Sequence, residues 1–282
     1  MSGTLYVVGT PIGNLGDWSP RAVETLERCD FIAAEDTRVT LKLLNHFGIK
    51  KPMVSYYEHN RHARGSEIVA RILAGENCAI VTDAGMPAIS DPGEDLVRLC
   101  LDSGICVSAV PGPVAFAAAL AISGMPSGRF TFEGFLSVSR RSRNAHLQSL
   151  QNETRTMLFY EAPHKLVATL RDMLNVFGER DIAIVREITK LHEETIRTTF
   201  SEALERYAQT PPKGEIVLIV SGAPQQEAPQ ASPEDAYAEA AALMEGGLSA
   251  SDAAKQAAKT FGFKKGDIYK FLTQERRQTD AP

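Results

Sequence analysis

The sequence predicts an α/β protein with two α/β domains, followed by a small helical module at the C-terminal end. Short apolar runs of strand length alternate with amphipathic stretches of helix length up to about residue 118, and a second such set follows up to about residue 223. In the first of these sets, strands that alternate with helices pair in parallel, which favours a doubly wound sheet. A segment rich in Pro, Gln, Ala and Glu then precedes the helical module. The expected domains are 1–118, 119–223 and 224–282.

The first domain contains five apolar runs, each followed by a turn or a charged group. The runs are residues 5–8, 31–34, 53–55, 78–81 and 106–110, and helices are expected at 20–28, 39–47, 66–74, 94–103 and 117–122. Ser19 is expected to cap the first helix, because Pro20 suits the first helical position. The loop 9–14 lacks both the G-x-G-x-x-G pattern and the lysine of a phosphate-binding loop, which disfavours a dinucleotide or ATP site.

The stretch 80–93, I-V-T-D-A-G-M-P-A-I-S-D-P-G, organises this domain. Its apolar run stops at Asp83, and Ala84 and Gly85 leave room for a ligand to approach the backbone. Open α/β sheets bind ligands at the carboxyl ends of their strands. A tight connection between strand and helix would give the same pattern, and both interpretations stay open at this point.

Charged residues also follow the second strand of this domain. Asp36 is either the N-cap of the next helix or a carboxylate that faces a ligand crevice together with Arg38. The two interpretations carry about equal weight.

The second domain is expected to contain strands at 130–136, 157–160, 182–185, 195–200 and 215–220. Residues 139–143 are interpreted as a basic loop, and residues 186–194 form the densest cluster of ionisable groups in the chain.

The C-terminal part begins with an expected linker over 222–235. Two short helices at 252–260 and 268–272, separated by a glycine turn, are typical of a helix-turn-helix. Residues 248–277 hold seven basic and three acidic residues, and basic side chains lie among Phe263, Tyr269 and Phe271. This combination suits contact with RNA phosphates and some base stacking, although a solubilising tail would look similar.

Composition limits the other possibilities. The chain has 44% hydrophobic and 23% charged residues, ordinary values for a soluble globular protein, and a net charge of −5, so a nucleic-acid partner must be bound by local patches. The four cysteines show no metal-ligand spacing and are expected to be reduced thiols in the core.

No apolar run approaches membrane-spanning length and no signal peptide is evident, so a cytoplasmic protein that avoids membranes is expected.

Seven motifs fall in order over residues 9–194: G-T-P-I-G-N-L, A-E-D-T-R, D-A-G-M-P-A-I-S-D-P-G, P-G-P-V-A, F-x-F-E-G-F-L, F-Y-E-A-P-H-K and R-E-I-T-K-L-H-E-E. On these motifs the chain closely resembles the bacterial small-subunit ribosomal RNA cytidine 2′-O-methyltransferases, a branch of the tetrapyrrole methylase family. Met86 departs from the threonine usual in that family, and Ser137 stands where a proline is frequent.

The resemblance implies S-adenosylmethionine bound in a cleft between two α/β domains, in a homodimer without a metal. It also implies the substrate, a cytidine in the decoding region of 16S ribosomal RNA within the small ribosomal subunit. Mapped onto this sequence, the cofactor is expected to touch Pro11, Ile12, Asp83, Ala84, Gly85, Met86, Val114, Ala115, Tyr160, Glu161, Ala162, Pro212 and Lys213.

The implied chemistry is an in-line displacement in which a ribose 2′-hydroxyl attacks the methyl carbon of a sulfonium. Alignment can supply on the order of 7–11 kcal/mol, and a carboxylate can accept the hydroxyl proton. The candidate catalytic residues are Asp36, Glu187 and Lys190, with Glu193 as a further carboxylate. The candidate RNA-binding residues are Arg38, Arg140, Arg141, Arg143, Arg186, Lys264, Lys265 and Lys270.

Two other functions remain compatible with the sequence. One is a C-methyltransferase that acts on a precorrin-type tetrapyrrole, although the basic segments argue against a small macrocyclic substrate. The other is a ribosome assembly factor that has no catalytic activity and binds no cofactor.

Overall fold

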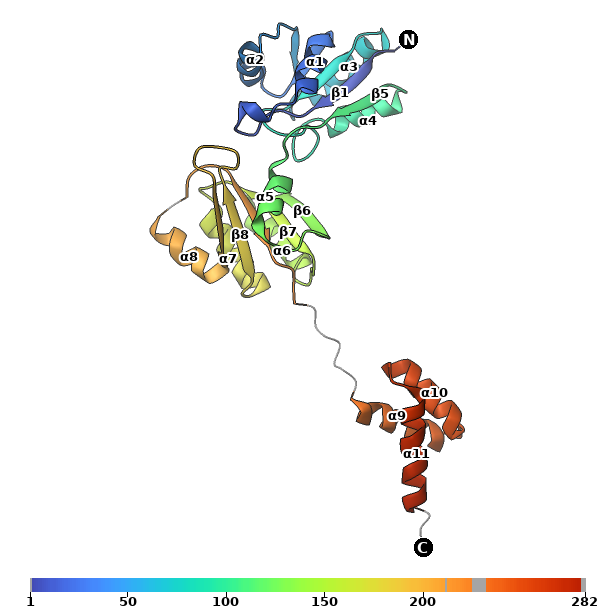
Figure 1. Ribbon diagram of the computed structural model, residues 1–282. Coiled ribbons are helices and arrows are strands. Elements are labelled where there is room, and N and C mark those ends of the chain that lie inside the picture. The colour runs from blue at the N-terminus through green and yellow to red at the C-terminus, as the bar shows by residue number, and fades with distance from the viewer. Residues whose placement is uncertain (1, 211, 225–231, 280–282) are drawn as a thin grey trace. The chain divides into compact units, whose positions relative to one another are not determined.

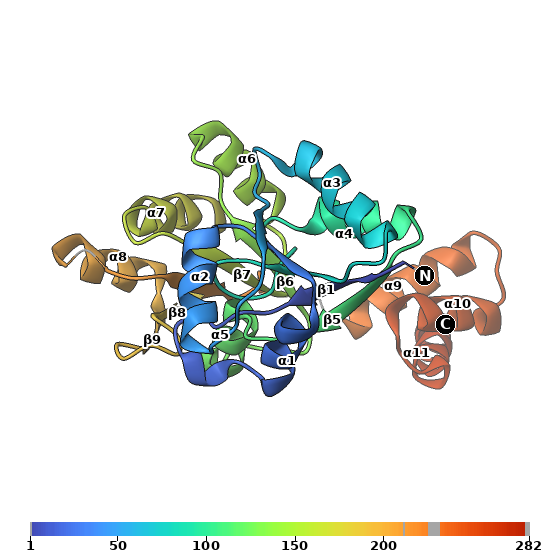
Figure 2. The same ribbon diagram turned by 90° about the horizontal axis from the view of Figure 1, so that it is seen from above.

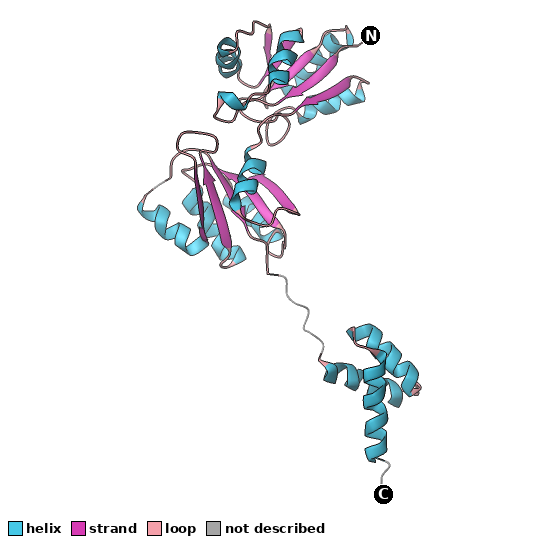
Figure 3. Cartoon of the chain, viewed as in Figure 1, coloured by secondary structure: helices cyan, strands magenta, loops and turns pink. Residues whose placement is uncertain are grey.

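A computed structural model of the chain describes residues 2–210, 212–224 and 232–279, with only the backbone described for 274–279. The chain forms two compact units, Met1–Ala223 and Pro224–Pro282. The first unit contains two five-stranded sheets, and the described residues of the second form helices (Figures 1 and 3). This architecture confirms the predicted α/β class with a helical C-terminal part. Among the described helices, none is both long enough and apolar enough to cross a membrane.

The first sheet is entirely parallel, with the strand order β3-β2-β4-β1-β5. Its strands are β1 (Thr4–Val8), β2 (Phe31–Ala34), β3 (Met53–Ser55), β4 (Cys78–Val81) and β5 (Cys106–Val110). Every residue of β2 and β4 is buried, because helices cover both faces of the sheet. Strands buried on both faces are uniformly apolar, and that property made them visible in the sequence.

Two pairs of helices cover this sheet. Helices α1 (Pro20–Arg28) and α2 (Thr37–His46) bury Leu26 and Leu44 against one face, after the short 3₁₀ helix η1 (Leu15–Asp17). Helices α3 (Arg61–Leu73) and α4 (Glu94–Asp102) bury Ile68 and Leu96 against the other. Figure 2 shows the two pairs on opposite sides of β1. The carboxyl ends of the parallel strands therefore stay free of helices and carry the loops.

Backbone hydrogen bonds fix the loops that follow β1 and β4. The Thr10 amide donates to the Gly85 carbonyl oxygen over 2.9 Å, and the Gly85 amide donates back to Thr10 over 3.2 Å. The Thr10 hydroxyl also donates to the Thr82 carbonyl oxygen at 3.0 Å, and the Trp18 indole donates to that of Gly9 at 2.8 Å. These hydrogen bonds hold the two loops side by side.

The second sheet is mixed, with the strand order β6-β7-β10-β8-β9. Only β6 and β7 pair in parallel, and the other neighbours are antiparallel. Its strands are β6 (Phe130–Phe135), β7 (Thr156–Glu161), β8 (Asp181–Arg186), β9 (Glu194–Thr199) and β10 (Ile216–Val220). Helices α6 (Arg140–Ser149), α7 (Leu166–Phe177) and α8 (Phe200–Gln209) pack on one face, and α5 (Ala115–Ser123) packs on the other (Figure 1).

Two expectations for this region need correction. The expected domain boundary at residues 118/119 falls inside α5, and that helix packs on β7, β8 and β10, so all of it goes with the second sheet. The basic segment 139–143 is the first turn of α6 rather than a loop. Leu147 is the only residue of that helix that is fully buried among those described, so the apolar periodicity that signals a helix is absent.

The C-terminal unit has three helices within its described residues, one more than predicted: α9 (Pro233–Glu245), α10 (Ala250–Phe261) and α11 (Lys265–Thr279). Ser232 and Asp235 form a capping box at the start of α9, so this helix begins inside the expected linker. Residues 225–231 of that linker lie outside the described residues. The core of the unit consists of small or aliphatic side chains, namely Ala236, Ala240, Ala254, Ala257, Ile268 and Leu272.

The aromatic residues of this unit also differ from the expectation. Phe271 stacks on Tyr237, with ring centroids 3.9 Å apart, and Phe263 packs against the core. Of the three aromatic residues expected to meet RNA bases, only Tyr269 is exposed, with 42% of its surface accessible.

The junction of β1 and β5 gives a first test of this fold. A Cβ atom on Gly112 would lie 2.7 Å from the Gly9 Cα, against backbone that no side-chain motion can clear. We expect Gly112→Ala to lower the free energy of unfolding by roughly 1–3 kcal/mol, the usual cost of overpacking. Gly128→Ala is the matched control, because a Cβ there meets nothing within 4 Å. Urea unfolding of both variants measures the difference, and equal midpoints would contradict the close approach.

Candidate functional site

A cavity of about 410 Å³ lies where the loops at the carboxyl ends of the first sheet meet the ends of β7, β8 and β10. We call it the inter-sheet cavity. Most of the residues expected to touch a cofactor line it, namely Ile12, Asp83, Ala84, Gly85, Met86, Val114, Ala115, Tyr160, Glu161 and Ala162. The structure therefore brings together motifs that are up to 150 residues apart, as the spacing of Ile12 and Ala162 shows.

The loop between β4 and α4 forms one wall of this cavity. Gly85 has a φ of 92°, and Ala88 and Ser90 have φ values of 66° and 61°, which L side chains rarely adopt. Such backbone persists only where the surrounding structure enforces it, and it clusters at ligand sites. The small side chains of Ala84, Ala115 and Ala162 leave backbone groups accessible along the walls.

Five carboxylates line the same cavity, namely Glu35, Asp83, Asp91, Glu161 and Glu215, and of these Glu215 forms an ion pair with Lys190. The Glu35 side chain accepts a hydrogen bond from the Asp83 amide at 3.3 Å, and the Asp83 side chain accepts one from the Asp36 amide at 3.2 Å. Loss of hydration raises the pKa of Glu35 and of Asp83. Loss of hydration, together with repulsion from Glu35 and Asp83, raises the pKa of Asp91 to about 7. The cavity thus concentrates negative charge that has no cation to balance it among the residues lining it.

Tyr160 and Glu161 at the end of β7 are held in place by their neighbours. The Phe116 amide donates to the Tyr160 hydroxyl at 3.3 Å, and burial raises the pKa of this tyrosine. Glu161 accepts hydrogen bonds from the Ala162 amide at 2.8 Å and from the Thr169 hydroxyl at 2.5 Å. Glu161 therefore fixes the start of the next turn.

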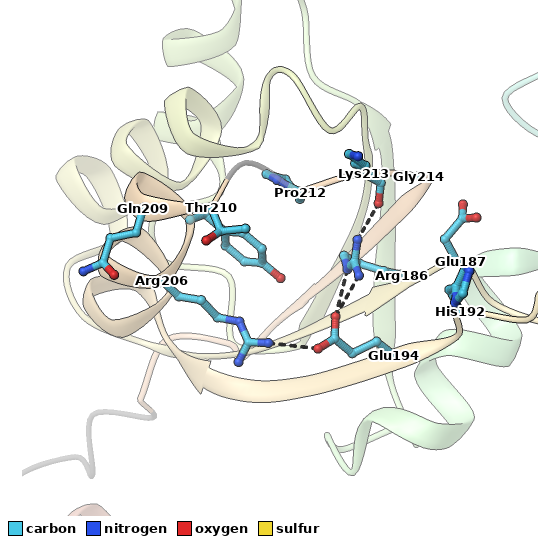
Figure 4. Close-up of a pocket in the computed structure, with 11 residues that line it drawn as sticks. Arg186, Glu187, His192, Glu194, Arg206, Gln209, Thr210, Pro212, Lys213 and Gly214 are labelled. Atoms are coloured by element: carbon cyan, nitrogen blue, oxygen red, sulfur yellow. Dashed lines mark hydrogen bonds and ion pairs between the residues drawn. The ribbon is translucent and has the colours of Figure 1, made fainter.

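A second cavity, of about 710 Å³, lies beside α8, and we call it the α8 cavity (Figure 4). Its lining consists of Arg186, Glu187, His192, Glu194, Arg206, Tyr207, Gln209, Thr210, Pro212, Lys213 and Gly214.

Three residues expected to touch the cofactor lie elsewhere. Pro212 and Lys213 line the α8 cavity and not the inter-sheet cavity, and Pro11 lines neither. The loop before β10 reaches the inter-sheet cavity through Glu215 instead.

The expected catalytic residue Asp36 is the N-cap of α2. Its carboxylate accepts hydrogen bonds from the Arg38 side chain at 2.6 and 3.0 Å, and this guanidinium lowers the pKa of Asp36 to about 2. Asp36 lines neither cavity, so the N-cap interpretation describes it better than the catalytic one.

Glu187 and Lys190 form an ion pair rather than a poised base. The Lys190 ammonium lies 3.0 Å from both the Glu187 and the Glu215 carboxylates. A hydrogen bond from the Glu215 amide, followed by one from Lys190, lowers the pKa of Glu187. Burial opposes the shift at Lys190, but the hydrogen bonds to both carboxylates raise its pKa. The third carboxylate considered, Glu193, accepts a hydrogen bond from the Thr189 amide at 2.6 Å.

The expected RNA-binding residues fall into two groups. Arg143 forms a largely buried ion pair with Asp172 at 2.7 Å, which makes it part of the packing between α6 and α7. Arg186 contacts Glu194 at 2.9 Å and donates to the Lys213 carbonyl oxygen. The others are exposed: Arg38, Arg140 and Arg141 in the first unit, and Lys264, Lys265 and Lys270 in the second.

Sequence reasoning missed Glu35, Asp91, Glu215 and Tyr207 as residues that line the cavities. Glu35 and Asp91 belong to two of the seven motifs, A-E-D-T-R and D-A-G-M-P-A-I-S-D-P-G, so those motifs were the available signal. Among the described residues, no group of three or more His, Cys, Asp or Glu side chains is arranged to hold a metal ion.

Comparison with known proteins identifies the family to which the chain is similar. A family model described as Tetrapyrrole (Corrin/Porphyrin) Methylases matches residues 4–204. A protein of Synechocystis sp. is 48% identical over 268 residues, which cover 95% of this chain and 96% of the relative. A protein of Halalkalibacterium halodurans is 43% identical and covers 97% of this chain and 96% of the relative. Both relatives carry the name Ribosomal RNA small subunit methyltransferase I.

Solved structures share the fold at low sequence identity. The methyltransferase CobJ matches with a TM-score of 0.59 and 18% identity, covering 79% of this chain and 95% of that one. Uroporphyrin-III C-methyl transferase from Thermus thermophilus, complexed with S-adenyl homocysteine, matches with a TM-score of 0.55 and 16% identity, covering 78% of this chain and 97% of that one. Because the family model matches residues 4–204 and the relatives are similar over nearly the whole length, the chain belongs to the tetrapyrrole methylase family.

Proposed function

We propose that this protein is an S-adenosylmethionine-dependent methyltransferase that methylates the 2′-hydroxyl of a cytidine in 16S ribosomal RNA of the small ribosomal subunit. The observation that carries the proposal is the likeness, over nearly the full length of the chain, to proteins named as ribosomal RNA small subunit methyltransferases. The tetrapyrrole methyltransferases share the fold at under 20% identity, so a tetrapyrrole substrate is not favoured. A non-catalytic assembly factor is not favoured either, because the relatives are named as methyltransferases.

The inter-sheet cavity fits S-adenosylmethionine. Its volume of about 410 Å³ lies within the range of small-molecule sites. The cofactor carries positive charge on its sulfonium and its amino group, and Glu35, Asp83 and Asp91 offer the opposite charge. Ala84, Gly85 and Ala115 offer backbone at a wall without bulky side chains, which suits a folded ligand. These are the residues that we propose hold the cofactor.

When bound, S-adenosylmethionine supplies a methyl group on a positively charged sulfur, a good leaving group. The rigid loops after β1 and β4 hold the site in one geometry, so alignment of the attacking oxygen supplies much of the acceleration. The proton of the 2′-hydroxyl needs an acceptor near the cavity. Asp91 is our candidate, because it lines the cavity and its pKa of about 7 matches that of an efficient base at neutral pH. Asp36 and Glu187 are bound by cations and are weaker bases.

RNA contact is proposed for the exposed cations of both units. Arg38 follows β2 at the same sheet edge as the cavity, and Arg140 and Arg141 lie at the start of α6. Lys264, Lys265 and Lys270 supply positive charge in the C-terminal unit. Because Arg143 is paired with Asp172, we leave it out of the proposed surface.

We also propose that two copies of the chain associate and that they act in the cytoplasm, where small ribosomal subunits are found. The support for a dimer is an exposed apolar strip on α5 and the edge strand β6. Ile122 and Phe130 expose 40% and 39% of their surfaces there, and exposed apolar surface of this kind is where protein–protein contacts form.

Methyl transfer tests the proposed function directly. Purified protein is mixed with S-adenosylmethionine carrying a tritiated methyl group, and with either small ribosomal subunits from a deletion strain or a precorrin. We expect label in 16S RNA, retained after alkaline hydrolysis in a dinucleotide, because a 2′-O-methyl group blocks cleavage of the next phosphodiester bond. Label released in a mononucleotide would indicate a base methylation instead, and label in the precorrin would favour the tetrapyrrole substrate.

The carboxylate cluster predicts how cofactor binding depends on pH. Asp91 is protonated below its pKa of about 7, so the cavity gains negative charge, and affinity for a cation, as the pH rises through 7. We expect S-adenosylmethionine to bind more tightly at pH 7.5 than at pH 6, by at most about eightfold for one group of this pKa. Calorimetry measures the affinity, and Asp91→Asn should abolish the pH dependence.

The same variant should stabilise the empty protein. A carboxyl whose pKa is raised on folding costs stability once the pH exceeds its unfolded value, so Asp91→Asn should raise the melting temperature at pH 8. Asp102→Asn, on the exposed end of α4, is the control. Unchanged pH dependence in Asp91→Asn would remove this residue from the site.

Truncation separates the roles of the two units. A chain ending at Ala223 keeps both sheets and the inter-sheet cavity. We expect it to bind S-adenosylmethionine with unchanged affinity and to sediment as a dimer. Its affinity for small subunits should fall and become less dependent on salt, by about 0.7–0.9 in log–log slope for each phosphate that the C-terminal unit neutralises. If affinity and salt slope stay the same, the C-terminal unit does not touch the RNA.

A further inference from the structure

The α8 cavity and the inter-sheet cavity lie on opposite sides of the same strand ends. Along β8, Val185 lines the inter-sheet cavity and the next residue, Arg186, lines the α8 cavity. Before β10, Gly214 lines the α8 cavity and Glu215 the inter-sheet cavity. Val185 and Arg186 are successive residues of β8, and successive side chains of a strand point to opposite faces, so the two cavities lie on either side of a thin wall there.

A strained loop and an ion pair complete this wall. Glu187 and Thr189 have φ values of 50° and 66°, in the region that non-glycine residues rarely occupy. Lys190 contacts Glu187, which lines the α8 cavity, and Glu215, which lines the inter-sheet cavity, over 3.0 Å each. The stem of Lys190 packs against Gly13, where an added Cβ would lie 2.5 Å from the Lys190 Cγ. The wall is thus braced against the loop that follows β1.

The α8 cavity carries an excess of cations. Arg186, Arg206 and Lys213 line it together with two carboxylates, Glu187 and Glu194. The Glu194 carboxylate lies 2.9 Å from the guanidinium groups of Arg186 and Arg206, and Figure 4 shows it between them. The three cations exceed the two carboxylates by one positive charge, and the exposed side chains of Lys213 and Arg206 place positive charge where an anion can reach it.

The cavity also holds a buried phenol that lacks a partner. Tyr207 is 5% exposed, and its hydroxyl forms no hydrogen bond with any residue that the structure describes. Burial raises the pKa of Tyr207, so its hydroxyl is neutral and can both donate and accept. Buried hydroxyls without partners are uncommon and costly, and one in a cavity wall is available to a ligand with polar edges.

We propose that the α8 cavity binds a nucleotide of the RNA substrate that lies close in the chain to the methylated one, with the cations on its phosphate and Tyr207 on its base or ribose. The inference rests on the proposed function, since it takes RNA as the ligand. The volume of about 710 Å³ is ample for a nucleotide. Single-stranded RNA is recognised through splayed-out nucleotides, and the thin wall places one such nucleotide beside the reaction site.

Two tyrosine variants test the phenol. Tyr207→Phe removes the hydroxyl and keeps the ring, so we expect unchanged S-adenosylmethionine affinity and an unchanged or higher melting temperature. Filter binding of small ribosomal subunits should show at least a fivefold weaker affinity. Tyr56→Phe is the matched control, because Tyr56 is 1% exposed, its hydroxyl also lacks a described partner, and it packs in the core of the first sheet. This control should bind subunits as the unmodified chain does.

Charge variants test the phosphate interaction independently. Arg206→Gln and Lys213→Gln should each reduce the log–log salt slope of subunit binding by about 0.7–0.9, the value for one phosphate that is no longer neutralised. Lys50→Gln, in the turn between α2 and β3, should leave the slope unchanged.

The possible outcomes separate the two proposals. If Tyr207→Phe behaves like Tyr56→Phe, and the charge variants behave like Lys50→Gln, the α8 cavity does not bind RNA and the inference is overturned. If the unmodified chain binds S-adenosylmethionine and subunits but transfers no methyl group to RNA, the proposed function fails, while the binding results still decide whether RNA enters the cavity.

Discussion

The arrangement of the site depends on one constraint, the close approach of the backbone at the ends of β1, β4 and β5. Gly9 and Gly112 lie so near to each other that neither position has room for a Cβ atom. The paired amides of Thr10 and Gly85 hold the neighbouring loop in register. Parallel strands all end at one edge, so this close approach gathers three loops into one wall. This close approach places the small residues of the three loops, such as Ala84 and Gly85, opposite the ends of β7 and β10.

The charges of the inter-sheet cavity act against folding and in favour of binding. Three carboxylates that lose hydration together destabilise the empty protein, and this explains the raised pKa values of Glu35, Asp83 and Asp91. A cationic ligand relieves this repulsion between carboxylates, and the relief adds to the free energy of ligand binding. Stability is commonly lower at functional sites for this reason.

Local patterns were sufficient to predict the sheets and the cavity wall, because each depends on contiguous residues. The buried strands are apolar runs, and the loops that follow them carry small residues and prolines. Helix α8 was missed although its signal is present: Thr199 and Glu202 form a capping box, and Phe200, Ala203 and Tyr207 make an apolar stripe. The apolar alternation of residues 195–199 continues through Phe200, the first residue of α8, and so hides the start of this helix. Helix α9 was missed because alanines, which give a weak apolar signal, form its buried face.

The roles of charged residues could not be predicted, since they depend on partners distant in the sequence. Arg143 is neutralised by Asp172, 29 residues away in the sequence. Loss of hydration raises the pKa of Asp91, and repulsion from the distant Glu35 adds to the shift. No local pattern indicates either effect. Asp36 is the opposite case, because its partner Arg38 is two residues away and the N-cap interpretation was available from the sequence.

The shared position of Lys190 has a thermodynamic consequence. This one ammonium group balances a carboxylate on each side of the wall, Glu187 and Glu215. A ligand that draws Lys190 toward one carboxylate leaves the other less neutralised, so the occupancy of one cavity changes the electrostatic potential in the other. Such coupling is reciprocal: whatever factor the first ligand applies to the affinity of the second, the second applies to the first. A single lysine can therefore make the two binding events cooperative without any movement of the sheets.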